Sequence, residues 1–167
     1  MFKKSPRMIP SNFVLDLDGV FTDGKFYYSE DGKYMKVFGA DDHDCINILK
    51  RFMKIHVVTA DAKGFEISRR RIERDMGLEI DLVSALDRTE WLAKKYNLSE
   101  TIYMGDGVLD YLVFSRVLYS IAPANALIST KNKASFITKN SGGERAVAEA
   151  CLHIINKFFP GQKHNLH

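Results

Sequence analysis

Five apolar runs of strand length alternate along the chain with segments of helical periodicity, and this alternation constrains the fold more than any other feature. The runs occupy residues 13–15, 55–59, 80–83, 101–104 and 118–122. Apolar residues at helical spacing lie between them, and a longer amphipathic segment covers residues 146–158. Repeated strand and helix predict a parallel sheet with helices on both faces. We therefore expect an α/β fold with a Rossmann-like parallel sheet.

The composition is that of one globular domain. The chain has 167 residues, of which 46% are hydrophobic, and its net charge is +3. This charge is too small to indicate a nucleic acid partner, and no apolar run approaches the ~20 residues of a membrane span. The first residues lack the apolar stretch of a signal peptide, so we expect a cytoplasmic protein. The predicted domain covers residues 10–160, and the tail 161–167 is expected to be mobile.

One segment interrupts the alternation directly after the first strand. Residues 25–38 contain two short runs rich in aromatic residues around Glu30-Asp31-Gly32, which predicts an inserted β-hairpin. An isolated hairpin does not bury so many aromatic side chains by itself. Phe26, Tyr27 and Tyr34 are therefore expected to pack against another subunit or, alternatively, against their own domain.

Two carboxylates follow the first strand. Asp16 and Asp18 are two residues apart, so their side chains leave the strand end on the same side and can share one site. Such close carboxylates repel each other unless a cation offsets their charge, and Mg²⁺ prefers oxygen ligands of this kind. With a metal to screen an incoming phosphate, Asp16 can attack phosphorus while Asp18 handles the proton of the leaving group. The pattern predicts phosphoryl transfer.

The ends of the later strands add complementary groups. Ligands of open α/β sheets bind beyond the carboxyl ends of the strands. Thr59 and Ala60 end the second run, where a hydroxyl and backbone N–H groups can receive a phosphate. Arg88 follows the third run, and the acids Asp106 and Asp110 follow the fourth. The strand ends together supply a nucleophile, a hydroxyl, a cation and metal ligands.

This order of residues resembles the haloacid dehalogenase superfamily of phosphatases. A closer resemblance is to the 3-deoxy-D-manno-octulosonate 8-phosphate phosphatases and their nonulosonate 9-phosphate relatives. It spans about residues 10–158, and it is carried by residues 16–24 (Asp-Leu-Asp-Gly-Val-Phe-Thr-Asp-Gly), residues 28–32 in the hairpin, Phe38, and residues 141–147 (Ser-Gly-Gly-Glu-Arg-Ala-Val).

The resemblance implies a Mg²⁺-dependent phosphatase that hydrolyses a phosphorylated sugar acid through an aspartyl-phosphate, as in lipopolysaccharide biosynthesis. It assigns phosphoryl acceptance to Asp16 and acid–base chemistry to Asp18. The metal ligands that it implies are Asp16, the backbone carbonyl of Asp18, and Asp106, with Asp110 in support. The phosphate-binding residues that it implies are Thr59, Ala60 and Arg88.

The same relatives have no lid domain, and no segment between Thr59 and Arg88 is long enough to fold as one. This chain is therefore expected to be capless. The relatives close their sites by forming tetramers in which the hairpins build a central barrel. A homotetramer is thus implied here too.

Several positions depart from the family pattern. Arg88 stands where the family has lysine, Ala60-Asp61 replaces Gly-Arg, and Gly107 replaces the second of two late aspartates. Residues 41–45 (Asp-Asp-His-Asp-Cys) replace Arg-Asp-Gly-Tyr-Gly, which adds negative charge where an anionic substrate would bind. Alternatively, Asp41 and Asp42 cap the helix that follows them.

Two other functional classes remain open at this level. The departures are compatible with a weakly active or inactive relative that serves as an oligomerisation or regulatory module. A phosphorelay receiver domain shares the sheet and a similar set of groups. It places its phosphoacceptor at the end of the third strand, however, where this chain has Ser84 and Ala85.

Overall fold

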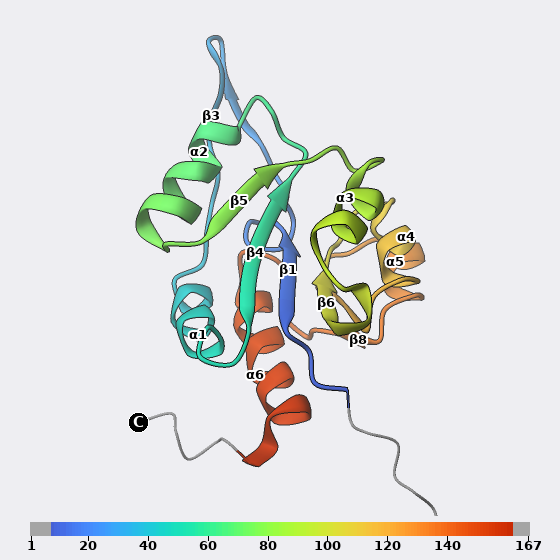
Figure 1. The fold of residues 1–167 in the computed structure, drawn as a ribbon. Coiled ribbons are helices and arrows are strands. Elements are labelled where there is room, and N and C mark those ends of the chain that lie inside the picture. The colour runs from blue at the N-terminus through green and yellow to red at the C-terminus, as the bar shows by residue number, and fades with distance from the viewer. Residues whose placement is uncertain (1–7, 162–167) are drawn as a thin grey trace, which may run out of the picture.

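The computed structural model describes residues 8–161, and within them six parallel strands form one sheet in the order β5-β4-β1-β6-β7-β8 (Figure 1). The strands of this sheet are β1 (Asn12–Asp16), β4 (Lys54–Thr59), β5 (Glu79–Leu82), β6 (Thr101–Met104), β7 (Tyr119–Ala122) and β8 (Phe136–Ile137). The helices are α1 (Asp41–Leu49), α2 (Phe65–Arg69), η1 (Arg70–Asp75), α3 (Arg88–Lys95), η2 (Leu98–Glu100), α4 (Asp110–Phe114), α5 (Ile128–Lys131) and α6 (Ala146–Phe158). The predicted α/β class is confirmed.

Helices cover both faces of the sheet because the strands carry apolar side chains on both faces. Phe13 and Leu15 of β1 point to one face, where they join a core with residues of α1, η1 and α6. Val14 points to the other face and packs with Leu92 of α3 and Val113 of α4. β1 pairs with β4 on one side and β6 on the other, so it lies inside the sheet. The acidic strand end is thereby held between two neighbours.

The segment after β1 forms the predicted hairpin. Its strands β2 (Tyr27–Ser29) and β3 (Gly32–Met35) pair antiparallel in a sheet of their own. In Figure 1 the hairpin rises beyond the carboxyl ends of β4 and β1. Tyr34 is 57% exposed, which leaves it available to a further surface. The hairpin therefore stands over the end of the sheet where ligands are expected.

The start of α6 differs from the sequence-based expectation. The spacing of Ser141 and Glu144 predicts a capping box at the start of this helix. In the structure, however, Arg145 is the N-cap, in the left-handed conformation, and no side-chain cap is formed by it. Instead Asp42, in the first turn of α1, accepts a hydrogen bond from Ala148 N–H at 2.9 Å. The expectation that Asp41 and Asp42 cap their own helix is wrong in the same way, because no side-chain cap is formed on α1. The carboxylate of one helix caps another.

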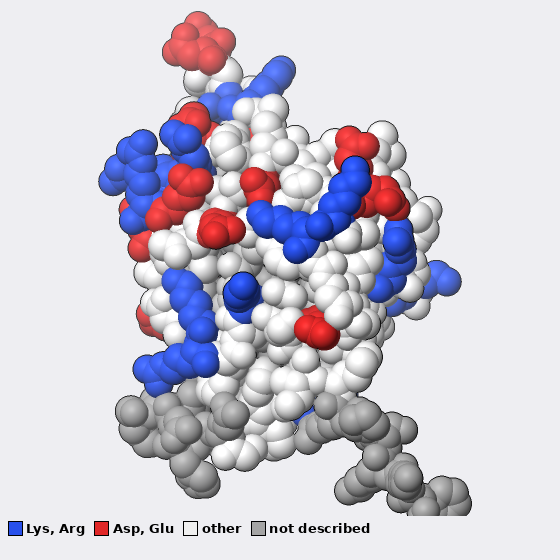
Figure 2. Space-filling view, viewed as in Figure 1, with Lys and Arg blue, Asp and Glu red and all other residues white. Residues whose placement is uncertain are grey.

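Charges of both signs alternate over α2 and η1. Arg69 pairs with Glu66 and Glu73, and Asp75 lies near Arg70 and Arg71. Figure 2 shows basic and acidic side chains intermixed in this part of the surface. This is a solvated, salt-paired helix face and not a basic stripe. Within residues 8–161, no helix has the length and apolar character needed to cross a membrane. The expected mobile tail lies outside the described residues, apart from Gly161.

Candidate active site

A pocket of about 450 Å³ opens at the carboxyl ends of β1, β4 and β6. Its lining comprises Asp16, Asp18, Phe26, Ala60, Asp61, Ala85, Arg88, Gly107, Val108, Leu109 and Asp110. Parallel strands end at one edge of a sheet, which is why residues far apart in sequence meet here. Phe26 comes from the hairpin, so the insertion forms part of the pocket wall.

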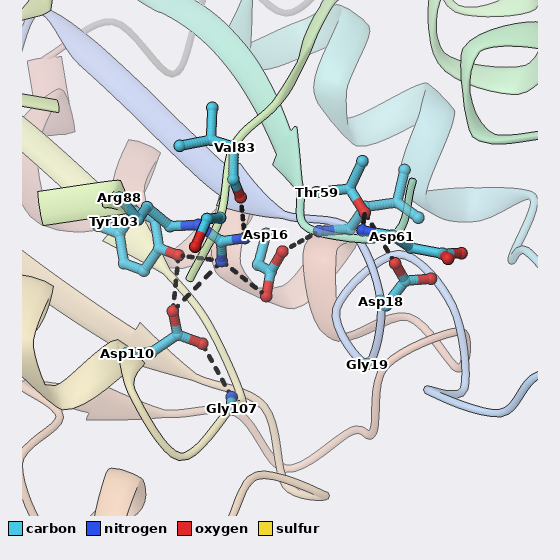
Figure 3. Close-up of polar contacts among 12 residues, drawn as sticks. Asp16, Asp18, Gly19, Thr59, Asp61, Val83, Arg88, Tyr103, Gly107 and Asp110 are labelled. Carbon is cyan, nitrogen blue, oxygen red and sulfur yellow. Dashed lines mark hydrogen bonds and ion pairs between the residues drawn. The ribbon is translucent and has the colours of Figure 1, made fainter. Parts of the chain in front are cut away.

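A buried network of polar groups surrounds the carboxylate of Asp16 (Figure 3). Arg88 Nη1 lies 3.0 Å from Asp16 Oδ2 and donates to the Tyr103 hydroxyl at 3.0 Å. Tyr103 in turn donates to Asp110 Oδ1 at 2.7 Å, and Arg88 Nη2 donates to the carbonyl of Val83. Arg88 is only 2% exposed. A guanidinium so enclosed holds a fixed orientation, because Asp16, Tyr103, Asp110 and the Val83 carbonyl, which come from four different segments, share its donors.

The second oxygen of Asp16 is also held, because the Leu17 N–H donates to Oδ1 at 2.9 Å. Burial raises the pKa of Asp16 to about 7, against the opposing effect of Arg88 and with a further contribution from Asp110. Burial, followed by repulsion from Asp16 and Asp110, raises the pKa of Asp106 to about 8. Clustered carboxyl groups in low dielectric hold protons more tightly until a cation replaces them.

Three of these carboxylates form a cluster with the geometry of a metal site. One oxygen each from Asp16, Asp106 and Asp110 can be chosen so that all lie within 4.8 Å of one another. The backbone of Gly19 closes over Asp106, since a Cβ at Gly19 would meet Asp106 Oδ2 at 2.1 Å. Gly19 also has a φ of +84°, which favours glycine. An all-oxygen, negatively charged set of ligands suits a hard divalent cation.

The carboxylate of Asp18 faces a different set of groups. Thr59 Oγ1 donates to Asp18 Oδ2 at 2.9 Å, and Lys36 Nζ lies 2.7 Å from Asp18 Oδ1. Lys36 follows β3, so it reaches the site from the hairpin. Both oxygens of Asp18 are therefore engaged by side chains, and Asp18 is not one of the three carboxylates in the cluster.

Asp61 occupies the position where the family pattern has arginine, and the hairpin supplies its counter-charges. Lys33 and Lys36 both form ion pairs with the Asp61 carboxylate. The Lys33 ammonium also sits over the ring of Phe26, 3.3 Å from its centroid. These hydrogen-bonded cations lower the pKa of Asp61, although its burial alone would raise it. The acid at this position is thus compensated within the chain itself.

A further contact fixes the loop after β1. Asn125 donates from its amide to the carbonyl of Gly19 at 2.9 Å, and its side-chain oxygen accepts from Gly142 N–H at 2.7 Å. Gly142 packs so closely that a Cβ there would meet the Gly19 carbonyl oxygen at 2.0 Å. The glycine pair before α6 therefore lets the chain lie directly against the loop that carries Asp18.

The structure brings the sequence-predicted residues Asp16, Asp18, Thr59, Arg88, Asp106 and Asp110 to one edge of the sheet, with Ala60 in the pocket lining. The acidic segment 41–44 does not contribute to that lining. Asp42 caps α6, and Asp41 pairs with Arg145. Four contributors were missed from sequence: Lys33, Lys36, Tyr103 and Asn125. The position of Lys36 between the apolar residues Met35 and Val37 could have indicated that it is buried. Nothing in the sequence distinguishes Tyr103 from other residues of its strand.

Comparisons with known proteins agree with this fold. Residues 87–150 match the family model described as haloacid dehalogenase-like hydrolase. The chain is 30% identical over 141 residues to the 3-deoxy-D-manno-octulosonate 8-phosphate phosphatase of Haemophilus influenzae, covering 81% of this chain and 77% of that one. It is 29% identical over 143 residues to the Escherichia coli K12 protein of the same name, covering 83% and 75%.

Solved structures give the same result. A cobalt-bound form of the deoxy-D-mannose-octulosonate 8-phosphate phosphatase from Haemophilus influenzae superposes with a TM-score of 0.78 at 28% identity, covering 89% of each chain. A probable YrbI family phosphatase from Pseudomonas syringae superposes with a TM-score of 0.79 at 27% identity, covering 96% of this chain and 94% of that one.

The fold, the Asp-x-Asp strand end and these matches define a haloacid dehalogenase-like hydrolase, and the chain belongs to that family. Its relatives act as phosphatases, and the protein is a phosphomonoester hydrolase. Within the family it is a member of the 3-deoxy-D-manno-octulosonate 8-phosphate phosphatase-like subfamily.

Proposed function

We propose that this enzyme is a Mg²⁺-dependent phosphatase that hydrolyses a phosphorylated sugar acid through an aspartyl-phosphate on Asp16. The candidate substrates are 3-deoxy-D-manno-octulosonate 8-phosphate and nonulosonate 9-phosphates. The observation that carries the proposal is that Asp16, which lines the pocket, is paired with Arg88 and also belongs to the carboxylate cluster with Asp106 and Asp110. A nucleophilic carboxylate, a fixed cation and a charged cluster at one point are what phosphoryl transfer requires.

In the proposed reaction Asp16 is the nucleophile and Asp18 transfers the protons. An oxygen of Asp16 forms a bond to phosphorus while the ester P–O bond breaks and its electron pair leaves with the ester oxygen. That oxygen takes the proton of a protonated Asp18, so the alcohol departs neutral. Water then attacks phosphorus and gives a proton to Asp18, and the bond between phosphorus and Asp16 breaks. Inorganic phosphate leaves, and both carboxyl groups return to their starting states.

Phosphate binding falls to the ends of β4 and α3 in this proposal. The Thr59 hydroxyl and the backbone N–H groups that follow it can donate to phosphate oxygens. Arg88 neutralises charge as it develops on the transferring group, and its enclosure by Tyr103 and Asp110 means that it needs no reorganisation when the reaction occurs.

Asp16, Asp106 and the backbone carbonyl of Asp18 would hold Mg²⁺, with Asp110 in support. The donor set fits this ion, because the cluster is made of carboxylate oxygens, and burial together with mutual repulsion raises the pKa values of Asp16 and Asp106. A bound Mg²⁺ would offset the repulsion between Asp16 and the phosphate. A relative at 28% identity is described in a cobalt-bound form, which supports a divalent cation here.

The substrate assignment rests on the relatives. Those that are 29–30% identical over most of this chain are named for 3-deoxy-D-manno-octulosonate 8-phosphate. The Asp61 position, with its two hairpin lysines, is a part of the pocket that departs from the family pattern. We therefore expect a sugar acid of this class, with the chain length and hydroxyl pattern set near Asp61.

We also propose a cytoplasmic homotetramer. The pocket is open at its mouth, and Tyr28, Tyr34 and Val37 of the hairpin are each more than two-fifths exposed. Exposed apolar groups beside an open site suit an assembly in which a neighbouring copy excludes water. Light scattering at micromolar concentration should give four times the monomer mass, and a stable monomer would rule this assembly out.

The substrate test is a panel of phosphorylated sugar acids with released phosphate as the readout, and Asp16→Asn as the blank. The expected result is a preference of at least about tenfold in kcat/KM for one eight- or nine-carbon sugar acid phosphate over hexose phosphates. Equal activity on all members would contradict the substrate class but not the phosphatase. The regulatory-module alternative is not favoured, since the relatives are phosphatases.

A further inference from the structure

Lys36 is a buried lysine whose ammonium makes three short contacts at the edge of the active site. Its Nζ lies 2.7 Å from Asp18 Oδ1 and 2.9 Å from Asp61 Oδ2, and it donates to Ser68 Oγ at 2.8 Å. The Lys36 side chain is 0% exposed. The three partners lie in the loop after β1, in the loop after β4 and on α2, so the amine links these three segments to the hairpin.

The burial of this amine is informative because a buried charge is costly unless it is paired. Lys36 sits in a short run of hairpin residues where its neighbours Met35 and Val37 are 40% and 41% exposed. A hairpin whose only task was to dock could use an apolar side chain at this position. The buried ammonium instead forms ion pairs with the carboxylates of Asp18 and Asp61.

The two oxygens of Asp18 are held in different ways. Oδ2 accepts from the Thr59 hydroxyl, a group that the proposed function gives to the substrate phosphate. A phosphate that takes this donor leaves Oδ2 free for proton transfer. Oδ1 remains paired with Lys36, which lies outside the pocket lining. One oxygen is thus anchored while the other is released by substrate.

We propose that Lys36 is a positioning residue that anchors Asp18 Oδ1 and so aims Oδ2 at the leaving-group oxygen. This inference rests on the proposed function, in which Asp18 delivers the proton. Lys36 does not touch the reacting atoms. Through it, the hairpin is tied to the acid–base step as well as to the pocket wall.

The test uses the dependence of rate on the leaving group. An alkyl phosphate needs a proton on its departing oxygen, whereas 4-nitrophenolate departs without one. kcat/KM reports the steps up to and including phosphoryl transfer to Asp16. In Lys36→Met, kcat/KM for an alkyl phosphate should fall on the order of 100-fold, and kcat/KM for 4-nitrophenyl phosphate by less than about fivefold. A merely structural loss would lower both to the same extent.

Lys33→Met is the matched control. Lys33 is also a buried hairpin lysine that pairs with Asp61, but no contact with Asp18 is recorded for it among the described residues. Its loss should change both substrates by one common factor. Thermal unfolding of both variants establishes that they are folded. If Lys36→Met lowers both substrates equally, or behaves as Lys33→Met does, the positioning role is overturned.

Asp18→Asn separates this inference from the proposed function. If Asp18→Asn shows the leaving-group-dependent loss and Lys36→Met does not, only the role of Lys36 fails. If Asp18→Asn shows no such dependence, the assignment of Asp18 as the acid fails, and the role of Lys36 fails with it.

Discussion

Arg88 Nη1 lies 3.0 Å from Oδ2 of Asp16, and this buried pair joins the end of β1 to the start of α3. The family pattern has lysine at this position. A single ammonium cannot match the separate donors that reach Asp16, Tyr103 and the Val83 carbonyl. The site is therefore built around a guanidinium, and the hydrogen bond to Tyr103 helps to fix its orientation.

Arg88→Met should lower kcat/KM for 4-nitrophenyl phosphate on the order of 100-fold, because a fixed donor to the developing charge is removed. Arg88→Lys should keep part of the activity. It should also be less stable than wild type, since the Tyr103 hydroxyl and the Val83 carbonyl lose their donor inside the protein. Steady-state kinetics and thermal unfolding check both outcomes. Wild-type kinetics in Arg88→Met would contradict the role given to this residue.

The carboxylate cluster predicts a pH dependence of the metal-free protein. The pKa values of Asp16 and Asp106 are raised to about 7 and about 8. Both lie above the unfolded value, so the folded chain binds more protons, and stability falls as pH rises from about 4 to about 8. Thermal unfolding in a chelator should show this fall. Added Mg²⁺ should stabilise more at about pH 8 than at about pH 6, because it replaces those protons.

Asp106→Asn is the control for this dependence. It removes one of the two raised groups and one metal ligand, so both the fall with pH and the stabilisation by Mg²⁺ should become smaller. If the stability of Asp106→Asn depends on pH as strongly as that of the wild type, the carboxylate cluster is not the source of the pH dependence.

Gly142→Ala should destabilise the protein by about 2 kcal/mol or more, because its Cβ would overlap the carbonyl oxygens of Gly19 and Thr22. Backbone at both sides cannot yield as a flexible side chain does. The loop that carries Asp18 should shift, and kcat should fall with stability. Gly161→Ala is the neutral comparison, since a Cβ there meets none of residues 8–161 within 4 Å. Denaturant unfolding that gave equal stabilities would contradict this close packing.

Asp42→Ala should cost about 1 kcal/mol, because the Ala148 N–H at the start of α6 loses its acceptor. Asp42→Asn keeps an acceptor oxygen and should be the more stable of the two variants. Asp42 does not line the pocket, so the activity of both variants should follow stability alone. Chemical unfolding checks the order, and a reversal of the two variants would contradict the capping role.

Much of the fold could be predicted from the sequence, because the spacing of apolar residues differs between strands and helices and shows which side chains are buried. The run at residues 101–104 coincides with β6, and the helix at 146–158 coincides with α6. β8 and α5 were missed because two- and four-residue elements carry no measurable period. The cap of α6 was wrong because Asp42 is 106 residues from its partner Ala148, and local spacing cannot reveal such a contact.

The candidate site, like the fold, could be predicted from the sequence only in part. Asp16 and Thr59 end strands, Arg88 and Asp106 follow strands, and the rule that ligands bind at strand ends places these residues together. Lys33 and Lys36 could not be placed, since the direction in which a hairpin folds back depends on tertiary packing. Asp61 therefore seemed to be a loss of positive charge, whereas the structure pairs it with two lysines.

The central claim is that Asp16 carries the phosphoryl group. The most direct measurement is Mg²⁺-dependent hydrolysis of 4-nitrophenyl phosphate by wild type and by Asp16→Asn, which keeps the size of the side chain and removes its nucleophilic charge. We predict turnover by wild type that a chelator abolishes, and none above the uncatalysed rate for Asp16→Asn. Equal rates for the two proteins would contradict the account.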